Sequence, residues 1–407
     1  MLDVAHAILQ NGEAYQGVAT DAFQEVVADL YDGFLSAEDR RGVPPPDHDV
    51  LSPLVKWGKP QFGPYTWPSD ATERLGVEAA IVSLPPAHGR GGLLAWAALA
   101  HEAAGHDVVH ANDGLESELS DKVRAALSKY PALADYWADR MDETAADVLG
   151  ILNMGPSAGI GLIGYFRGLR AVFDGVARLS NEASPYDPHP ADILRGFLAA
   201  EVVRLCPFAG RDAWADAILQ ETLQDWVNGQ LRIAGKPIDQ ATARSSAEVV
   251  AQAIAQSHLT ELGGHSLASI QTWRDRDEQI VDALCQALGV PVGLSAELTG
   301  GVYAAHVVAA AVRSALRPDA DIALIFTRML RLLKQMHDSN PAWGPLFVMR
   351  RGDIARHRIW PGTGTGDVPV FARAPQPARP RAQGHAAPRS RGNVRDAARD
   401  LERAAPG

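Results

Sequence analysis

The sequence predicts a mainly α-helical protein, and three observations support that class. Alanine and leucine dominate the apolar residues, whereas aromatic residues make up only 7% of the 407. Strong helix formers outnumber β-branched residues over most of the chain. In the clearest segments, apolar residues recur at the spacing of a helix face. With 46% hydrophobic residues, the chain is long enough to bury a core without disulfide bonds.

The N-terminal part combines helices with a short β region. Residues 1–40 predict two helices, the second over Gly17–Leu35, where apolar residues recur with the helical period. A proline-rich connector follows at 43–53. Aromatic and β-branched residues broken by Gly and Pro predict short strands between residues 54 and 86. We therefore expect one small sheet before the central helices.

A strongly apolar helix then begins after Gly91-Gly92, covers residues 93–111 and ends at Asn112-Asp113-Gly114. Further helices are expected over residues 116–129, 131–152, 158–180, 190–205, 211–231, 245–260, 266–288 and 299–338. The uncharged stretch Val148–Phe166 approaches the length of a membrane span. Its five glycines and Pro156 instead favour a helix end, a loop and a new helix.

The charge and the cysteines narrow the class of protein. A net charge of −11 and a pI near 5.6 argue against non-specific binding to nucleic acid or to an anionic membrane. The N-terminus lacks a basic region followed by an apolar block, so no secretory signal is expected. Cys206 and Cys285 lie in apolar contexts without a CxxC spacing. We interpret them as buried, reduced thiols of a cytoplasmic protein.

Polar residues interrupt the apolar helix at 93–111 and suggest a metal site. Several charged side chains on one buried helix need a common partner. The familiar zinc spacing is HExxH, but here position i+4 after His101 is Gly105, and the second histidine, His106, falls at i+5. In a regular α-helix these two side chains would diverge by roughly 140°. One wider π turn would bring both to the same side, and Gly105 permits it.

Two motifs resemble known zinc peptidases. The run His101-Glu102-Ala103-Ala104-Gly105-His106 resembles the HExxGH signature of the dipeptidyl peptidase III family of gluzincins. Asp142-Glu143-Thr144-Ala145-Ala146-Asp147 is similar to its second signature, with Asp142 in place of a glutamate and Ala145 in place of a basic residue. The same run is similar to the ExxAD segment of a second gluzincin family, as is His189-Pro190 followed by Arg195.

These resemblances imply a zinc metallopeptidase with His101, His106 and Glu143 as metal ligands. The residues themselves support the same arrangement. Glu143 and Asp147 are one helical turn apart, so Asp147 can accept a hydrogen bond from a ligand imidazole while Glu143 binds Zn²⁺. Glu102 adjoins His101 without being needed as a ligand. It can therefore act as the general base that takes a proton from the attacking water.

A peptidase also needs a hydrogen-bond donor for the oxyanion. The loop Tyr186–Pro190, stiffened by prolines, is our candidate, with His189 as the first choice and Tyr186 as the second. In gluzincins generally, an extended peptide pairs with an edge strand, and the predicted strand Val77–Leu84 is similar in position. Arg195 is expected to be a buried partner for an acid such as Asp147 rather than a clamp on the substrate.

Two other hypotheses remain open. In the first, His106 and Asp107 bind the metal of an HD-type phosphohydrolase together with another histidine and a distant aspartate, so Asp107 is a ligand and Glu143 is dispensable. An alternative metal site uses His106, Asp107 and His110 in an HDxxH arrangement, with Glu102 one turn earlier. In the second, the protein is a catalytically inactive metal-binding interaction protein. In the peptidase hypothesis, His110 does not bind the metal and instead belongs to the residues that surround the ligands. The alternative for His110 is a helix-end histidine that satisfies late carbonyl groups.

We expect three regions along the chain. Residues 1–205 form the zincin-like catalytic region, and residues 206–372 form a helical region that completes the cleft. Residues 373–407, rich in Ala, Arg and Pro, cannot bury enough apolar surface to order and are predicted to be a disordered tail. The expected partner is a peptide or protein substrate, with no nucleic acid and no membrane.

Overall fold

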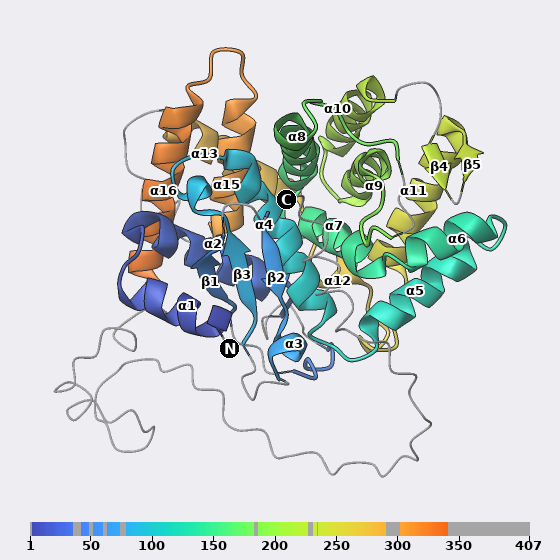
Figure 1. The fold of residues 1–407 in the computed structure, drawn as a ribbon, viewed down its shortest axis with the longest axis horizontal. Coiled ribbons are helices and arrows are strands. Elements are labelled where there is room, and N and C mark those ends of the chain that lie inside the picture. The colour runs from blue at the N-terminus through green and yellow to red at the C-terminus, as the bar shows by residue number, and fades with distance from the viewer. Residues whose placement is uncertain are drawn as a thin grey trace, which may run out of the picture. The chain divides into compact units, whose positions relative to one another are not determined.

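The mainly α-helical class is confirmed (Figure 1). The structure is a computed structural model that describes residues 2–35, 42–48, 52–59, 63–73, 79–182, 186–226, 231–233, 235–289 and 302–340. Contacts group residues 1–344 into one unit, to which every described residue belongs. The predicted tail at 373–407 lies outside the described residues.

Helices alternate with two short strand regions along the chain. In sequence order, the elements are α1 (Leu2–Gly12), α2 (Gly17–Leu35), β1 (Leu54–Trp57), β2 (Tyr65–Trp67), α3 (Ser69–Glu73), β3 (Ile81–Leu84), α4 (Leu93–His101), α5 (Leu115–Ala126), α6 (Pro131–Ala138), α7 (Met141–Met154), α8 (Pro156–Phe173), α9 (Asp192–Leu205), α10 (Arg211–Gln224), β4 (Leu231–Ile233), β5 (Lys236–Ile238), α11 (Gln240–Gln256), α12 (Leu267–Ile270), α13 (Asp275–Gly289), α15 (Ala304–Ala315) and α16 (Ile322–Ser339). A π turn, Glu102–Asp107, continues α4.

Three predicted helices are each divided in two. The helix expected at 131–152 is α6 and α7, separated where Arg140 leaves helical geometry and its side chain donates to the Tyr136 and His189 carbonyl groups. The helix expected at 299–338 is α15 and α16, because Pro318 has no N–H to continue the hydrogen-bond ladder. The helix expected at 266–288 is α12 and α13.

The uncharged stretch at 148–166 is divided as predicted. Gly155, with φ of 64°, ends α7 and precedes α8. A β-carbon at Gly155 would lie 2.5 Å from the Trp273 ring, so glycine is required there for packing as well as for conformation. Within the described ranges, no helix has both the length and the apolar character needed to cross a bilayer.

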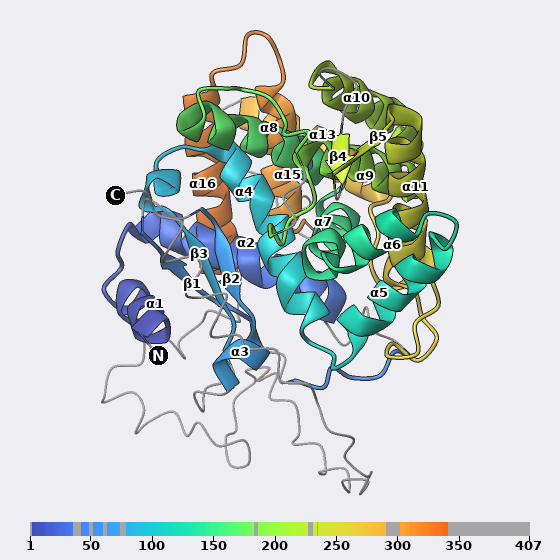
Figure 2. The same cartoon turned by 45° about the vertical axis from the view of Figure 1, so that its right-hand side comes forward.

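The predicted β region forms a three-stranded sheet in the order β1-β3-β2. β1 pairs with β3 in parallel, and β2 pairs with β3 antiparallel, with Thr66 opposite Val82. The prediction that the strand ending at Leu84 is an edge was wrong, because β3 is the central strand. The edge nearest the π turn is β2, which contacts that turn (Figures 1 and 2). Val77, where the strand was predicted to begin, lies outside the described residues.

Helix α4 lies at the centre of the core, which explains why it is apolar all round. It packs against α2, α7, α8 and α15, so it has no solvent face. Helices from beyond residue 205 support this core: α15 contacts α4 and α8, while α10 and α11 pack on α9. Both cysteines are free; Cys206 is buried, whereas Cys285 is only half-buried, so the prediction of burial holds fully for Cys206 alone.

Candidate metal centre

The π turn predicted from the sequence spacing is present at Glu102–Asp107. It brings the two histidines to the same side of the helix, as the wider turn requires. The Nε2 atoms of His101 and His106 lie 3.2 Å apart, and the two rings are nearly perpendicular at 86°. Two unprotonated ring nitrogens at this distance direct their lone pairs toward the same point, which is the arrangement a metal ion needs.

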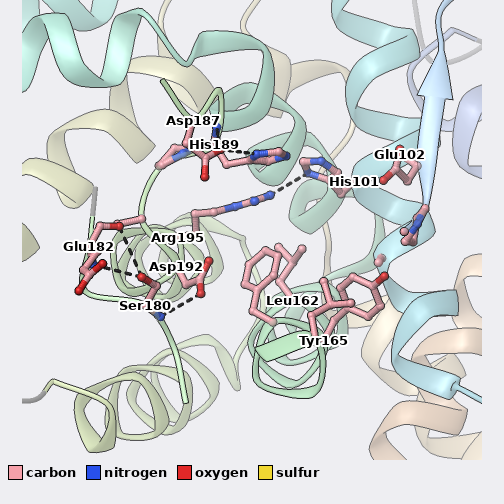
Figure 3. Close-up of a pocket in the computed structure, with 17 residues that line it drawn as sticks. His101, Glu102, Leu162, Tyr165, Ser180, Glu182, Asp187, His189, Asp192 and Arg195 are labelled. Atoms are coloured by element: carbon pink, nitrogen blue, oxygen red, sulfur yellow. Dashed lines mark hydrogen bonds and ion pairs between the residues drawn. The ribbon is translucent and has the colours of Figure 1, made fainter. Parts of the chain in front are cut away.

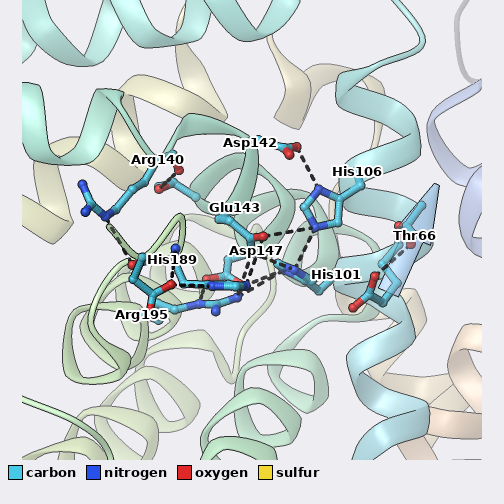
Figure 4. Close-up of polar contacts among 12 residues, drawn as sticks. Thr66, His101, His106, Arg140, Asp142, Glu143, Asp147, His189 and Arg195 are labelled. Atoms are coloured by element: carbon cyan, nitrogen blue, oxygen red, sulfur yellow. Dashed lines mark hydrogen bonds and ion pairs between the residues drawn. The ribbon is translucent and has the colours of Figure 1, made fainter. Parts of the chain in front are cut away.

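Helix α7 approaches the π turn closely because glycines remove side chains from the contact. A β-carbon at Gly105 would lie 2.5 Å from the Cα atom of Ala146, and one at Gly150 would lie 2.9 Å from the Ala100 carbonyl carbon. This packing places the Glu143 carboxylate beside both imidazoles (Figure 4). Small residues at the contact are therefore part of the site, as the alanines of the second motif suggested.

The three side chains fit a cation. Glu143 Oε2 lies 3.2 Å from His101 Nε2, and Glu143 Oε1 lies 3.7 Å from His106 Nε2. Ligand atoms of a tetrahedral zinc site, about 2.0–2.1 Å from the ion, are separated by roughly 3.3 Å. Glu143 Oε2 is also buried without a hydrogen bond of acceptable geometry. The nearest cationic groups to this oxygen are the His101 imidazole and the Arg195 guanidinium, whose Nη2 atom lies 3.8 Å away. A metal ion bound between the two imidazoles would give the oxygen a closer positive partner.

Asp147 and Arg195 orient the first histidine. His101 Nδ1 lies 2.9 Å from Asp147 Oδ1, which holds a proton on Nδ1. Nε2, which faces Glu143, is therefore the nitrogen that can bind a metal ion once it has lost its own proton. Arg195 in turn donates to both oxygens of Asp147, at 2.7 and 2.8 Å, and its guanidinium stacks on the Phe166 ring. Asp147 and Arg195 thus lie in the positions that the sequence predicted for them.

The second histidine has an equivalent acidic partner. His106 Nδ1 lies 2.8 Å from Asp142 Oδ1, and the same oxygen lies 3.3 Å from His110 Nε2. On its other side, His110 Nδ1 lies 3.5 Å from Asp70 Oδ2. Burial alone would lower the pKa of His110, but the bonds to Asp142 and Asp70 outweigh it and raise the pKa to about 10. His110 therefore contacts the centre through Asp142 rather than directly.

The loop before α9 brings one of its two predicted residues to the centre. His189 Nε2 lies 3.2 Å from Glu143 Oε1, and its Nδ1 lies 2.8 Å from Asp187 Oδ1. Arg140 holds this loop by donating to the His189 carbonyl oxygen. Tyr186, the second choice, is 94% exposed and does not line the cavity beside the metal centre. The structure therefore places His189, and not Tyr186, within reach of a reacting group.

A cavity of about 290 Å³ adjoins the centre. His101 and Glu102 form one wall, and Leu162 and Tyr165 of α8 lie beneath it (Figure 3). Ser180, Glu182, His189, Asp192 and Arg195 are among the residues that line the remaining walls. In the described part of the chain, every lining residue precedes position 206. In the predicted region 206–372, α10 and α15 pack against α8, which lines the cavity, and α10 and α11 pack against α9.

Glu102, the predicted general base, faces this cavity. Its side chain is 7% exposed, and its Oε2 atom lies 2.8 Å from the Thr66 hydroxyl of β2. Burial keeps bulk water away from the carboxylate, while the cavity gives a substrate access to it. Thr66 is a residue that sequence reasoning missed, since only the sheet brings it to a helix 36 residues away.

Asp107 does not join the candidate metal centre. Among the described residues, the ligand atoms that gather there belong to His101, His106 and Glu143. Asp107 is 2% exposed, and neither of its carboxylate oxygens has a hydrogen-bond partner. Burial raises the pKa of its carboxyl group well above the ordinary value, which favours the neutral acid. The phosphohydrolase hypothesis requires Asp107 to bind the metal directly, and the position of its side chain does not agree with that role.

We predict that Asp147→Asn destabilises the zinc-free protein by about 3–5 kcal/mol, because the buried Arg195 guanidinium loses the carboxylate that it contacts most closely and keeps only a longer contact with Glu143. Zinc affinity should also fall by about 10–100-fold, as happens when the outer partner of a ligand histidine is lost. Urea unfolding with a chelator present and zinc competition measure the two effects. Asp135→Asn is the control: its side chain is 69% exposed, and its ion pair is with Arg124. Equal destabilisation by both variants would contradict the prediction.

No protein-family model, no curated protein and no solved structure matches the chain.

Proposed function

We propose that this protein is a zinc-dependent metallopeptidase, a hydrolase of peptide bonds. One observation carries the proposal: two imidazole nitrogens and a buried carboxylate converge beside Glu102 in the wall of a cavity. His101, His106 and Glu143 would hold Zn²⁺, which lowers the pKa of a water molecule and polarises a carbonyl group when bound. Imidazole and carboxylate ligands with one open position are typical of catalytic zinc.

The surrounding residues can supply the remaining steps. Glu102, oriented by the Thr66 hydroxyl, would accept a proton from the attacking water and pass it to the leaving amine. His189, with its Nδ1 fixed by Asp187, would turn its Nε2–H from Glu143 to the oxygen that becomes negative. Bonds to Asp187 and Glu143 outweigh the effect of burial and raise the pKa of His189 to about 9, so it carries the required proton at neutral pH.

The substrate would be a peptide or an exposed segment of a protein. An extended chain could pair with the outer edge of β2, since Gly63 and Pro64, just before that strand, line the cavity. The apolar side chains of α8 would then receive one substrate side chain. The net charge of −11 supports a partner other than nucleic acid. The two free cysteines support a cytoplasmic location.

The contacts favour this proposal over an HD-type phosphohydrolase. That alternative needs Asp107 as a ligand, and Asp107 lies outside the group of converging ligand atoms. An inactive metal-binding protein would have the same three ligands. It would not, however, need a carboxylate such as Glu102, held by Thr66 in a cavity wall beside the ligands.

The deciding experiment uses the full chain and a quenched fluorogenic library of random peptides. We expect cleavage by the protein loaded with one equivalent of zinc, loss of cleavage after chelation, and recovery when zinc is added back. Bis(p-nitrophenyl) phosphate serves as the competing probe. Hydrolysis of this phosphodiester without peptide cleavage would support the phosphohydrolase. A zinc-loaded protein that cleaves neither probe would overturn the proposal in favour of the inactive protein.

We also predict that zinc binds more tightly as the pH rises from 6.5 to 9. Without metal, burial opposes protonation of His101, but Asp147 and Glu143 outweigh it and raise the pKa from 6.5 to about 10. The protonated ring therefore stabilises the zinc-free fold fully below pH 6.5, and this contribution is lost as the pH rises through about 10. Zinc must displace that proton, so affinity should rise about tenfold per pH unit for each proton released. Chelator competition measures it; pH-independent affinity would contradict the prediction.

A further inference from the structure

The π turn requires support from outside its own helix. A π turn is rare and replaces the regular α-helical hydrogen bonds over Glu102–Asp107. Helix α7 supports one side, where Gly105 lies against Ala146. Helix α2 and strand β2 also pack against the turn, so the contacts at its two ends have to be considered separately. The relative position of His101 and His106 depends on those ends, because His101 immediately precedes the turn and His106 lies next to its last residue.

At the first end, a side chain from the sheet holds the turn. The Thr66 hydroxyl lies 3.1 Å from the Glu102 backbone oxygen and 2.8 Å from its carboxylate Oε2. The hydroxyl has one proton, so it donates to one of these acceptors at a time. Both acceptors belong to the residue at which the π turn begins. Figure 4 shows Thr66 on the strand that runs beside this part of the helix.

Beyond the second end, an acid from the next element reaches the helix. Asp70 of α3 lies 3.5 Å from His110 Nδ1, and His110 Nε2 lies 3.3 Å from Asp142. Asp142 in turn lies 2.8 Å from His106 Nδ1. A chain of charged contacts therefore runs from α3 to the second metal ligand. Burial disfavours the charge on Asp70, but its contact with His110 lowers the pKa of the carboxyl group overall.

Thr66 and Asp70 belong to the same short piece of chain. We propose that the β2–α3 segment, residues 65–73, is a positioning element that holds the π turn from both ends and so sets the zinc affinity without supplying a ligand. The inference deepens the proposed function and rests on it, because His101, His106 and Glu143 are taken as the ligands. Thr66 and Asp70 are positioning residues, since neither touches the three ligand atoms.

The test compares Thr66→Val, Asp70→Asn and the double variant with the wild-type chain. Zinc affinity is measured by competition with a chromophoric chelator, and the ligand geometry is followed by the visible spectrum of the cobalt-loaded protein. We expect the double variant to bind zinc about tenfold more weakly or worse, with a changed cobalt spectrum. Thr66→Ser keeps the hydroxyl group and should restore wild-type affinity.

Thr72→Val is the matched control. Thr72 is buried in the same segment, and its hydroxyl donates to the Ser69 and Ala79 carbonyl oxygens rather than to any described residue of the π turn. This variant should lose stability without losing zinc affinity or changing the cobalt spectrum. The proposal is overturned if the Thr66 and Asp70 variants bind zinc as the wild type does. It is equally overturned if Thr72→Val weakens zinc binding as much as they do.

Hydrogen exchange separates this inference from the proposed function. In the zinc-free double variant, the backbone amides of Gly105 to Val109 should exchange about tenfold faster than in the zinc-free wild type. Unchanged exchange would count against the positioning role even if the protein bound no zinc. If the variants behave as expected but no peptide is cleaved by the wild type, the proposed function fails and the positioning role stands.

Discussion

Glu102→Gln should keep zinc and lose peptide hydrolysis by about 10²–10⁴-fold, the contribution usual for a general base. Glutamine has the shape of glutamate and can still accept the hydrogen bond from Thr66, so the cavity wall should be preserved. Its amide cannot take a proton from the attacking water. The loss should appear in kcat, measured on the most rapidly cleaved library peptide, with zinc content determined on the same sample.

Glu182→Gln is the control for this variant. Glu182 also lines the cavity, on a wall that lies away from Glu102 (Figure 3). Its side chain makes no ion pair among the described residues, so its neutralisation should leave kcat within a few-fold of wild type. If Glu102→Gln retains wild-type kcat while Glu182→Gln does not, the general base has been assigned to the wrong carboxylate.

The second large effect is expected from Glu143→Gln, which should bind zinc far more weakly than wild type. The loss should exceed the roughly 10–100-fold that follows removal of a ligand's outer partner, because here a charged ligand itself is neutralised. Glu143 faces His101, His106 and His189 together. Within the described ranges, no other carboxylate oxygen joins the ligand group. Competition with a chelator at about pH 7.5 gives the affinity.

The control for Glu143→Gln is Glu201→Gln on the neighbouring helix α9. Glu201 pairs with Arg204 and takes no part in the ligand group. It should retain zinc at wild-type affinity. Zinc retention by Glu143→Gln, together with its loss in Asp107→Ala, would restore the phosphohydrolase hypothesis. Retention in both variants would mean that the ion binds elsewhere.

Much of the centre could be predicted because its main groups lie close together in two runs of sequence. The one-residue departure from HExxH required a π turn, and the turn is present. The spacing of Glu143 and Asp147 correctly placed one beside the imidazole Nε2 atoms and the other on Nδ1 of His101. That these groups bind zinc remains a prediction, as does the peptidase activity.

The contacts that were missed cross between distant elements. Thr66 and Asp70 have no local signal, because a threonine and an aspartate near a short strand are common. The order of the strands in the sheet also could not be predicted from the sequence pattern. All the β3 residues are buried, and all except Ser83 are apolar, but only the strand pairing shows that β3 is central and β2 is the edge. Tyr186 was chosen for its loop, and the side chain points into solvent.

The π turn amounts to one residue inserted into an otherwise regular helix, and the wider turn absorbs that residue without rotating the side chains that follow it. Deleting Ala103 or Ala104 would place the two histidines four residues apart. In a regular α-helix they would then diverge by only about 40° and would still lie on one side. Later side chains such as His110 would also stay close to their present face. The same set of ligands could therefore survive either the gain or the loss of this single residue.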